Sequence, residues 1–159
     1  GRSDEFMELK TKKKIRVMST VLFLLYLLAL GYFLFFAEGF GRAIEDRGYR
    51  YNLEPMKEIM RFWNNRETLG TSAVLLNLAG NVLAFVPFGA ILPVLNRHTR
   101  GFFRIGLLSL EFSFLMECFQ LMFRVGSFDV DDMILNTLGG ITGFLLFAIC
   151  NGVRRRLYE

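Results

Sequence analysis

Four stretches of this chain are long and apolar enough to cross a lipid bilayer as helices: residues 17–37, 72–95, 102–123 and 133–153. Crossing the hydrocarbon takes about 20 predominantly apolar helical residues. Hydrophobic residues make up 53% of the 159-residue chain, which includes 18 Phe. A soluble core of this size could not bury so much apolar surface. The sequence therefore predicts an all-α membrane protein with four transmembrane helices in a compact bundle.

Two short segments precede the first apolar stretch. Residues 1–6 have the composition of an expression scar, so we take residues 7–159, starting at Met7, as a single membrane domain. A basic segment follows, and the apolar stretch after it could be read as a signal peptide. Residues 17–37 are longer than a typical signal-peptide core, and no small-residue cleavage motif follows them. We therefore expect an uncleaved first span.

The basic residues indicate how the spans are oriented. If the N-terminus is cytoplasmic, residues 7–16, 96–104 and 151–159 face the cytoplasm, whereas residues 38–70 and 124–132 face outward. Lys and Arg are denser in the first set than in the second. Cytoplasmic loops carry an excess of these residues, so both termini are predicted to be cytoplasmic. This orienting role also explains the net charge of +4 without a nucleic-acid partner.

The outward segment 38–70 is predicted to contain an extracytoplasmic amphipathic helix. Between Glu54 and Glu67, apolar side chains recur at helical spacing; they are Met56, Ile59, Met60 and Trp63. Pro55 suits the first turn of such a helix. Two positions are open for it: in the outer membrane interface with Trp63 at headgroup depth, or packed on top of the bundle.

Polar side chains occur inside or beside three of the spans, where their burial is costly and makes them candidates for function. They are Asn77 and Asn81 with the second span, Glu117, Gln120 and Arg124 with the third, and Asp129, Asp131, Asp132 and Asn136 with the fourth. In the predicted orientation all of them lie in the outer part of the membrane. Glu111, nearer mid-membrane, is the exception. The sequence therefore predicts one polar site that three helices form at the outer surface.

Carboxylates beside an arginine and amides suit a general base, a cation site or a binding cleft. The candidates for catalysis are Glu117, Asp129, Asp131 and Asp132. The candidates for binding are Asn77, Asn81, Gln120, Arg124 and Asn136. Asp129, Asp131 and Asp132 also have the oxygen ligands of a divalent-cation site, although we expect neither a metal nor a cofactor. For each of these residues, a structural role in joining the helices is equally open.

Small residues and cysteines bear on packing. Gly139 and Gly143 form a G-x-x-x-G motif, which lets two helix backbones approach closely. We expect this motif to pack helices within the bundle, and a homodimer through it is the alternative. Cys118 and Cys150 both lie in apolar stretches, so neither a disulfide framework nor a zinc site is predicted.

Three motifs in the chain resemble those of the VanZ-like family of bacterial membrane proteins. The first is Asn52-Leu53-Glu54-Pro55-Met56, with Met56 where the family often has Phe. The second is Asn77-Leu78-Ala79-Gly80-Asn81. The third is Glu117-x-x-Gln120-x-x-x-Arg124, continued by Asp129-x-Asp131-Asp132-x-x-x-Asn136 and then Gly139 and Gly143. Together they cover residues 50–145.

The resemblance implies a place in the cytoplasmic membrane of a Gram-positive bacterium and an association with resistance to teicoplanin-type glycopeptides. It implies no defined reaction. The expected function is to limit access of lipoglycopeptides to cell-wall precursors. The alternatives are an outer-leaflet enzyme that modifies a lipid or a lipid-linked precursor, and a small transporter, which the lack of a visible inverted repeat disfavours. Expected partners are membrane lipids, with a lipid-linked precursor or a lipoglycopeptide.

Overall fold

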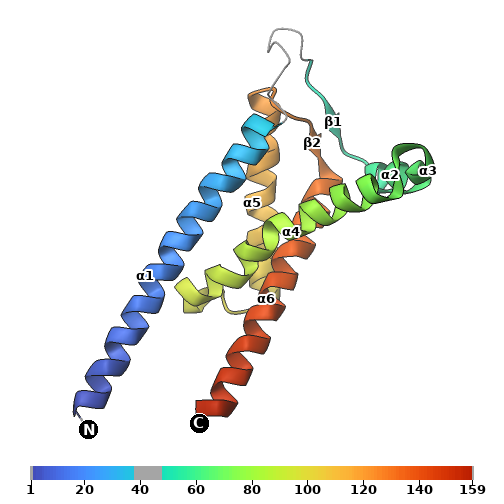
Figure 1. The fold of residues 1–159 in the computed structure, drawn as a ribbon. Helices are drawn as coiled ribbons and strands as arrows, with labels where there is room; N and C mark the ends of the chain where they lie inside the picture. Colours follow the sequence, from blue (N-terminus) through green and yellow to red (C-terminus); the bar gives the residue numbers. More distant parts are fainter. Residues whose placement is uncertain (1, 38–47, 159) are drawn as a thin grey trace.

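The computed structural model describes residues 2–37 and 48–158, and almost all of its ordered elements are helices (Figure 1). The elements in chain order are α1 (Arg2–Tyr32), a π-helical turn η1 (Phe33–Ala37), β1 (Tyr51–Asn52), α2 (Lys57–Asn64), α3 (Arg66–Leu69), α4 (Thr71–Leu95), a 3-10 turn η3 (Arg97–Thr99), α5 (Phe102–Met122), β2 (Phe128–Asp129) and α6 (Val130–Tyr158). Part of the outward segment, residues 38–47, lies outside the described residues. Helices α1, α4, α5 and α6 are long and apolar enough to cross a membrane, so the all-α prediction is confirmed.

The two helices that carry the chain ends are longer than the apolar stretches from which they were predicted. The first begins at Arg2 rather than near residue 17, and the last runs from Val130 to Tyr158 rather than from 133 to 153. Lys, Glu and Arg are good helix formers, so a helix continues past the apolar region when nothing stops it. Asp131 and Asp132, which we expected ahead of the last span, lie in its first turn, where acidic groups are favourable.

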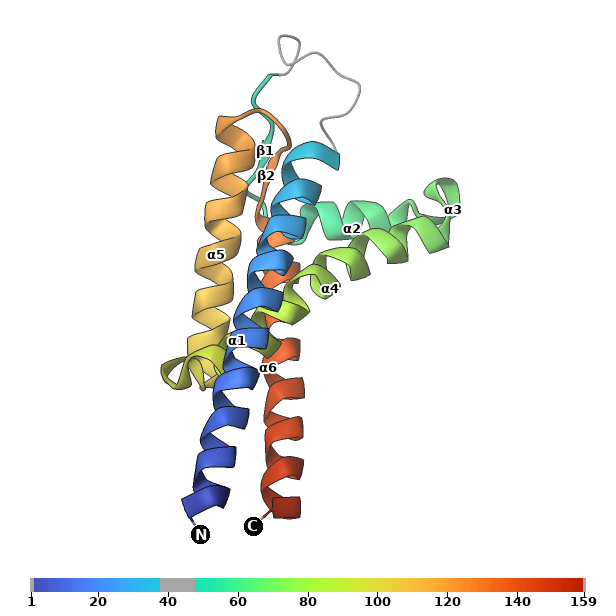
Figure 2. The same ribbon diagram turned by 60° about the vertical axis from the view of Figure 1, so that its left-hand side comes forward.

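Helix α6 forms the centre of the bundle, and α4 crosses it obliquely (Figures 1 and 2). Helix α5 packs along the other side of α6, and α1 lies against α4. The rings of Phe85, Phe88 and Phe112 join α4 to α5, with Phe88 and Phe112 stacked at a centroid distance of 5.1 Å. On the other side of α4, the Tyr26 hydroxyl donates a hydrogen bond of 2.6 Å to the Ala84 carbonyl and so anchors α1.

Glycines make the crossing of α4 and α6 possible. A Cβ added at Gly139 or Gly143 would lie 2.0 Å from the carbonyl oxygen of Val82 or Val86, respectively. On α4, a Cβ at Gly89 would meet the Gly140 carbonyl oxygen at 1.7 Å. The G-x-x-x-G motif therefore packs α6 against α4 inside the bundle, and its close-approach surface is already occupied there.

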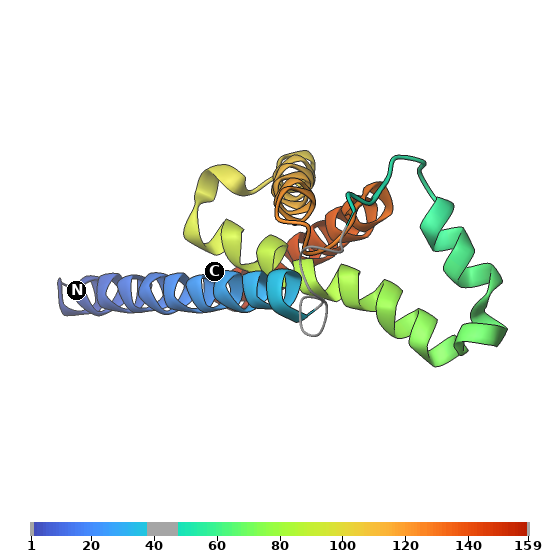
Figure 3. The same cartoon turned by 90° about the horizontal axis from the view of Figure 1, so that it is seen from above.

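The predicted amphipathic helix between the first two spans is present, but its bounds of 54–67 were wrong. Pro55 precedes the helix instead of forming its first turn, and the chain breaks at Asn65 into α2 and α3. These two helices project sideways from the bundle next to the first half of α4 (Figures 2 and 3). The apolar face is left largely uncovered, since Met60 is 49% exposed and Trp63 is 46% exposed. This geometry fits the interfacial position better than one on top of the bundle.

Replacing Gly143 by alanine should separate α4 from α6. The added methyl group would meet backbone atoms of Val86 and Ala90, which have little room to move. We expect Gly143→Ala to lower the free energy of unfolding by about 1–3 kcal/mol, measured by thermal unfolding in a mild detergent. Gly80→Ala is the matched control, since nothing lies within 4 Å of that position on α4. Equal stability of the two variants would show that the glycines do not determine the crossing.

Candidate functional site

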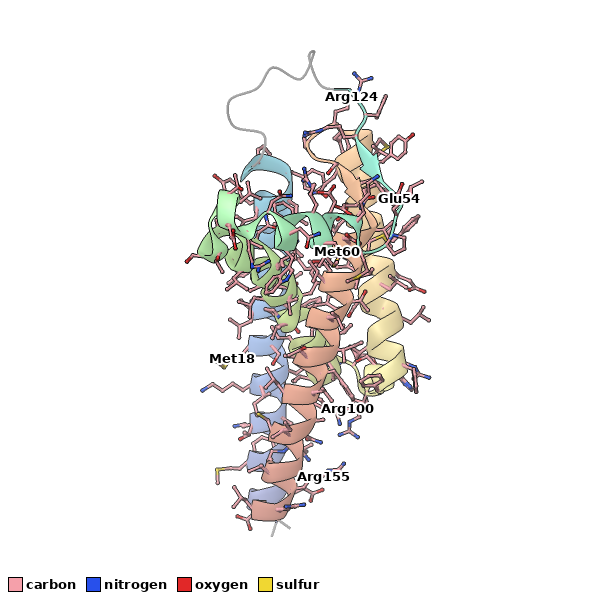
Figure 4. The ribbon with its side chains drawn as sticks, turned by 90° about the vertical axis from the view of Figure 1, so that its right-hand side faces the viewer. Met18, Glu54, Met60, Arg100, Arg124 and Arg155 are labelled. Atoms are coloured by element: carbon pink, nitrogen blue, oxygen red, sulfur yellow. The ribbon has the colours of Figure 1, made fainter. Side chains whose placement is uncertain are left out.

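The candidate residues lie at the end of the bundle where α5 ends and α6 begins. The two-residue strands β1 and β2 pair there in parallel, with Tyr51 opposite Phe128 and Asn52 opposite Asp129. Figure 4 shows Arg124 and Glu54 at this end, whereas Arg100 and Arg155 lie toward the opposite end, which carries both termini. We refer to Asn52, Glu117, Asp129 and Asp131 as the carboxylate network.

Asp131 holds the start of α2. Its Oδ1 accepts a hydrogen bond from the backbone amide of Met56 at 2.5 Å. Its Oδ2 accepts from the amides of Glu58 at 2.7 Å and Ile59 at 3.0 Å. Both carboxylate oxygens are thereby used, and the residue is only 1% exposed. Asp131 therefore acts as the N-cap of a helix that lies far from it in the sequence.

Local residues cannot supply this cap. The residue at the N-cap position of α2 is Met56, whose side chain has no acceptor and makes no capping bond. Met56 also has a φ of 67°, a left-handed conformation that costs an ordinary side chain about 1–2 kcal/mol. Hydrogen bonds to a charged group are worth about 1.5–3 kcal/mol each. The three bonds to Asp131 can therefore hold the backbone of Met56 in this conformation.

Asp129 connects three elements. Its Oδ1 accepts from the Asp131 amide at 2.9 Å, which makes Asp129 the N-cap of α6. The same oxygen accepts from the Asn52 side-chain amide at 2.9 Å, across the strand pair. Asn52 in turn accepts from the Glu54 amide through its Oδ1, which turns the chain toward α2. The strands are short, and these side-chain bonds hold them in register.

Glu117 links the network to α5. It is 2% exposed, and its Oε2 accepts a hydrogen bond of 2.9 Å from the Asp129 backbone amide. The network therefore runs from α5 through β2 and α6 to β1 and α2. In these hydrogen bonds the acidic side chain accepts from a backbone amide or from the Asn52 side chain, and the bonds hold the elements together.

The remaining polar candidates on α4 and α6 have different surroundings. Asn81 donates to Asp132 Oδ1 at 2.8 Å and so joins the two helices. Asn77, expected on the same face as Asn81, is exposed and makes no hydrogen bond with the described residues. Asn136 is buried and donates to the Ser113 hydroxyl on α5 at 2.9 Å. The predicted single cluster is thus a network with separate helix-joining pairs beside it.

Gln120 binds the end of α1. Its side-chain amide donates to the Leu34 carbonyl at 3.2 Å. Leu34 belongs to the π-helical turn η1, and such turns disturb the regular hydrogen-bond pattern of a helix. Gln120 thereby ties α5 to the end of α1.

Arg124 closes the C-terminus of α5 in a left-handed conformation, with a φ of 55°. The amide of Val125 bonds to the Gln120 carbonyl and that of Arg124 to the Leu121 carbonyl, which is the Schellman pattern usually completed by glycine. The guanidinium donates to the Tyr49 hydroxyl at 3.1 Å and lies 4.4 Å from the centroid of its ring. A positive charge is favourable at this helix end.

Burial raises the pKa of the Asp129 carboxyl above its ordinary value. The hydrogen bonds from Asn52 and the Asp131 amide oppose this shift, while the negative charges of Asp131 and Glu58 add to it. Asp129, Asp131 and Asp132 direct oxygens toward different partners. Within residues 2–37 and 48–158, no group of three His, Cys, Asp or Glu side chains is arranged to hold a metal ion.

Three residues of this region were not among the candidate site residues. The sequence could have indicated Asn52 as a site residue, because it belongs to the Asn-Leu-x-Pro motif before α2. Nothing in the sequence distinguished Ser113 or Tyr49, because a single serine in a span or an aromatic residue in a loop has no characteristic spacing. Glu111 is exposed on α5, away from the network.

These observations define a four-helix membrane protein in which a buried carboxylate at one end of the bundle binds the start of a short helix. The family model described as VanZ/LLP1 matches residues 23–151, so the chain belongs to the VanZ/LLP1 family. This confirms the resemblance seen in the motifs.

One relative is the protein named Protein VanZ from Enterococcus faecium, which is 38% identical over 71 residues. The match covers 45% of this chain and 44% of that protein. No solved structure is significantly similar to this chain.

Asp131→Asn should release the start of α2. Asparagine keeps only one acceptor oxygen, so at least one backbone amide would face an NH2 group, at a cost of about 3 kcal/mol. We expect trypsin to cut the purified protein after Lys57 and Arg61 at least about tenfold faster than in the wild type. Asp129→Asn, which keeps the oxygen that accepts both bonds, is the control. Cleavage of Asp131→Asn at the wild-type rate would contradict the capping role.

The raised pKa of Asp129 predicts a pH-dependent difference between wild type and Asp129→Asn. The Asp129 carboxyl binds its proton more tightly in the folded protein than in the unfolded chain. Its protonation therefore stabilises the fold fully below the ordinary Asp pKa of about 4, and this stabilisation is lost as pH rises through the higher pKa of the folded state. Asparagine stays neutral throughout. The melting temperature of Asp129→Asn relative to wild type should therefore rise between about pH 4 and about pH 8. A constant or falling difference would show that burial does not disfavour the ionised carboxylate.

Proposed function

We propose that this VanZ-family protein acts at the extracytoplasmic side of a Gram-positive membrane. There it lowers susceptibility to lipoglycopeptides of the teicoplanin type by limiting their access to lipid-linked cell-wall precursors, without catalysing a reaction. Membership of the VanZ/LLP1 family and the similarity to Protein VanZ support the assignment. One observation supports a function without catalysis: the acidic side chains are engaged in hydrogen bonds that hold the fold. Asp131 uses both of its carboxylate oxygens in this way, and Asp129 uses one of its two.

The network also presents an apolar surface. It places α2 beside the bundle with Met60 and Trp63 about half exposed, and Tyr51 and Leu53 exposed before it. An apolar surface next to a polar end suits a ligand with a lipid tail and a polar head, such as a lipid-linked precursor or a lipoglycopeptide. A general base, in contrast, needs a carboxylate that is free to take a proton from a substrate.

The distribution of basic residues supports an outward position for this end. Both termini and the turn between α4 and α5 lie at the opposite end, and these are the Lys- and Arg-rich segments. In a Cys118→Ala/Cys150→Ala background, we expect Asn64→Cys to react with a membrane-impermeant maleimide on intact cells. His98→Cys should react only after lysis. The reverse pattern would place the network in the cytoplasm.

Susceptibility measurements in a teicoplanin-sensitive Gram-positive host test the function. Wild-type protein should raise the inhibitory concentration of a lipid-tailed glycopeptide several-fold, and that of a glycopeptide without a lipid tail much less. Asp131→Asn at equal membrane abundance should lose this protection because α2 is released. Glu111→Gln is the matched control, since Glu111 lies outside the network. If Asp131→Asn protected the cells as well as the wild type does, the carboxylate network would not be required for the function.

Mass spectrometry distinguishes the enzymatic alternative. Membrane lipids and lipid-linked precursors from cells with and without the protein should have the same composition. A modified species that depends on the protein, and that disappears in Glu117→Gln, would replace the access-limiting proposal with outer-leaflet chemistry.

A further inference from the structure

A second polar region lies at the end of the bundle that carries both termini, remote from the carboxylate network. It is a cavity of about 530 Å3 between α1, the turn after α4 and the last part of α6. Five basic side chains from these three segments line it: Lys12, Arg16, Arg97, Arg100 and Arg154. Among residues 2–37 and 48–158, no acidic side chain lines it. Basic residues that converge from separate helices on one cavity differ from a row of charges on a single exposed face.

Arg100 is fixed in position near other positive charges of this cavity. Arg100 donates from its Nε to the Pro93 carbonyl at 2.8 Å, and its guanidinium lies 5.2 Å from the centroid of the Phe147 ring. Burial lowers the pKa of Arg100, and the positive charges of Arg97, Arg154 and Arg155 lower it further. Neighbouring positive charges repel each other, so an anion bound between them would relieve the repulsion.

Among the described residues, few carboxylates pair with the basic side chains of this cavity. Lys12 pairs with Glu8 at 2.6 Å, but Glu8 does not line the cavity. In the part of the chain that the structure describes, none of the four arginines makes an ion pair with a carboxylate. Arg154 donates only to the neutral Asn151 side chain, at 3.4 Å. The cavity therefore combines room for a ligand with several guanidinium groups that no carboxylate of the described residues neutralises.

The rest of the lining indicates what kind of anion would bind. Ile15, Val94 and Leu95 contribute aliphatic side chains to the same cavity. Val94 and Leu95 end the apolar helix α4, so the cavity lies where this helix passes from lipid to water. A small free anion would leave this aliphatic surface unused, whereas an anionic lipid presents a phosphate next to its acyl chains. Basic pockets between membrane helices bind such headgroups.

We propose that this cavity binds the phosphate headgroup of an anionic membrane lipid in the leaflet that faces the chain termini. The guanidinium groups of Arg16, Arg97 and Arg154 contact the phosphate, and Ile15, Val94 and Leu95 contact the first part of the acyl chains. The site is independent of the carboxylate network, so it persists whatever the outer end binds.

The test uses the purified full-length chain with phosphatidylglycerol or phosphatidylcholine of identical acyl chains, measured by native mass spectrometry. The wild type should retain phosphatidylglycerol in preference. Arg16→Gln/Arg97→Gln should weaken phosphatidylglycerol binding about tenfold or more. Lys10→Gln/Lys14→Gln removes the same charge from the opposite face of α1, outside the cavity, and should change binding less than about twofold. Equal losses in the two variants, or no headgroup preference in the wild type, would overturn the proposal.

Two further arms distinguish the ligand source and exclude a folding artefact. Val94→Phe fills the cavity without changing charge and should also lose the retained lipid, while its melting temperature stays close to the wild-type value. Retention of the lipid by Val94→Phe would refute the cavity as the site. Inorganic phosphate at millimolar concentration should not displace the lipid. Displacement by phosphate alone would identify a small-anion site and overturn the lipid assignment.

Discussion

The end of the bundle that carries the carboxylate network depends on one interaction, the binding of the α2 N-terminus by the Asp131 carboxylate. A buried carboxylate is unfavourable unless it is hydrogen-bonded, and the free amides at a helix start need acceptors. The three bonds from Met56, Glu58 and Ile59 solve both problems at once. Because α2 is fixed there, the chain can leave the strand pair, run beside the bundle and enter α4.

This interaction changes how the acidic residues are interpreted. A group of carboxylates at one depth in a membrane protein suggests catalysis or a metal site. In the structure, Asp129 and Asp131 accept hydrogen bonds from backbone amides, and Glu117 accepts from the amide of Asp129. The motifs by which the chain resembles the VanZ-like family include these residues and Asn52. In the structure the hydrogen bonds of these residues join β1, α5, β2 and α6.

The four spans were predictable because apolar length decides whether a helix crosses hydrocarbon. The direction of each polar side chain was not. Asp131 and Asp132 are adjacent, yet a helical rotation of about 100° per residue sends the first to α2 and the second to Asn81. The start of α2 depends on a two-residue strand pair and a left-handed Met56, which the local sequence does not encode. Likewise, Asn77 lies one helical turn before Asn81 and on the same face of α4. It is nevertheless exposed, because the first part of α4 diverges from the bundle.

Nuclear magnetic resonance of the labelled protein in lipid nanodiscs tests the central claim most directly. The amides of Glu58 and Ile59 should show scalar coupling through the hydrogen bond to the Asp131 carboxyl carbon. Their protons should also exchange with water far more slowly than those of an unstructured peptide. If neither amide couples to Asp131 and both exchange at the unstructured rate, α2 is not held by this carboxylate, and the structural role assigned to the carboxylate network is wrong.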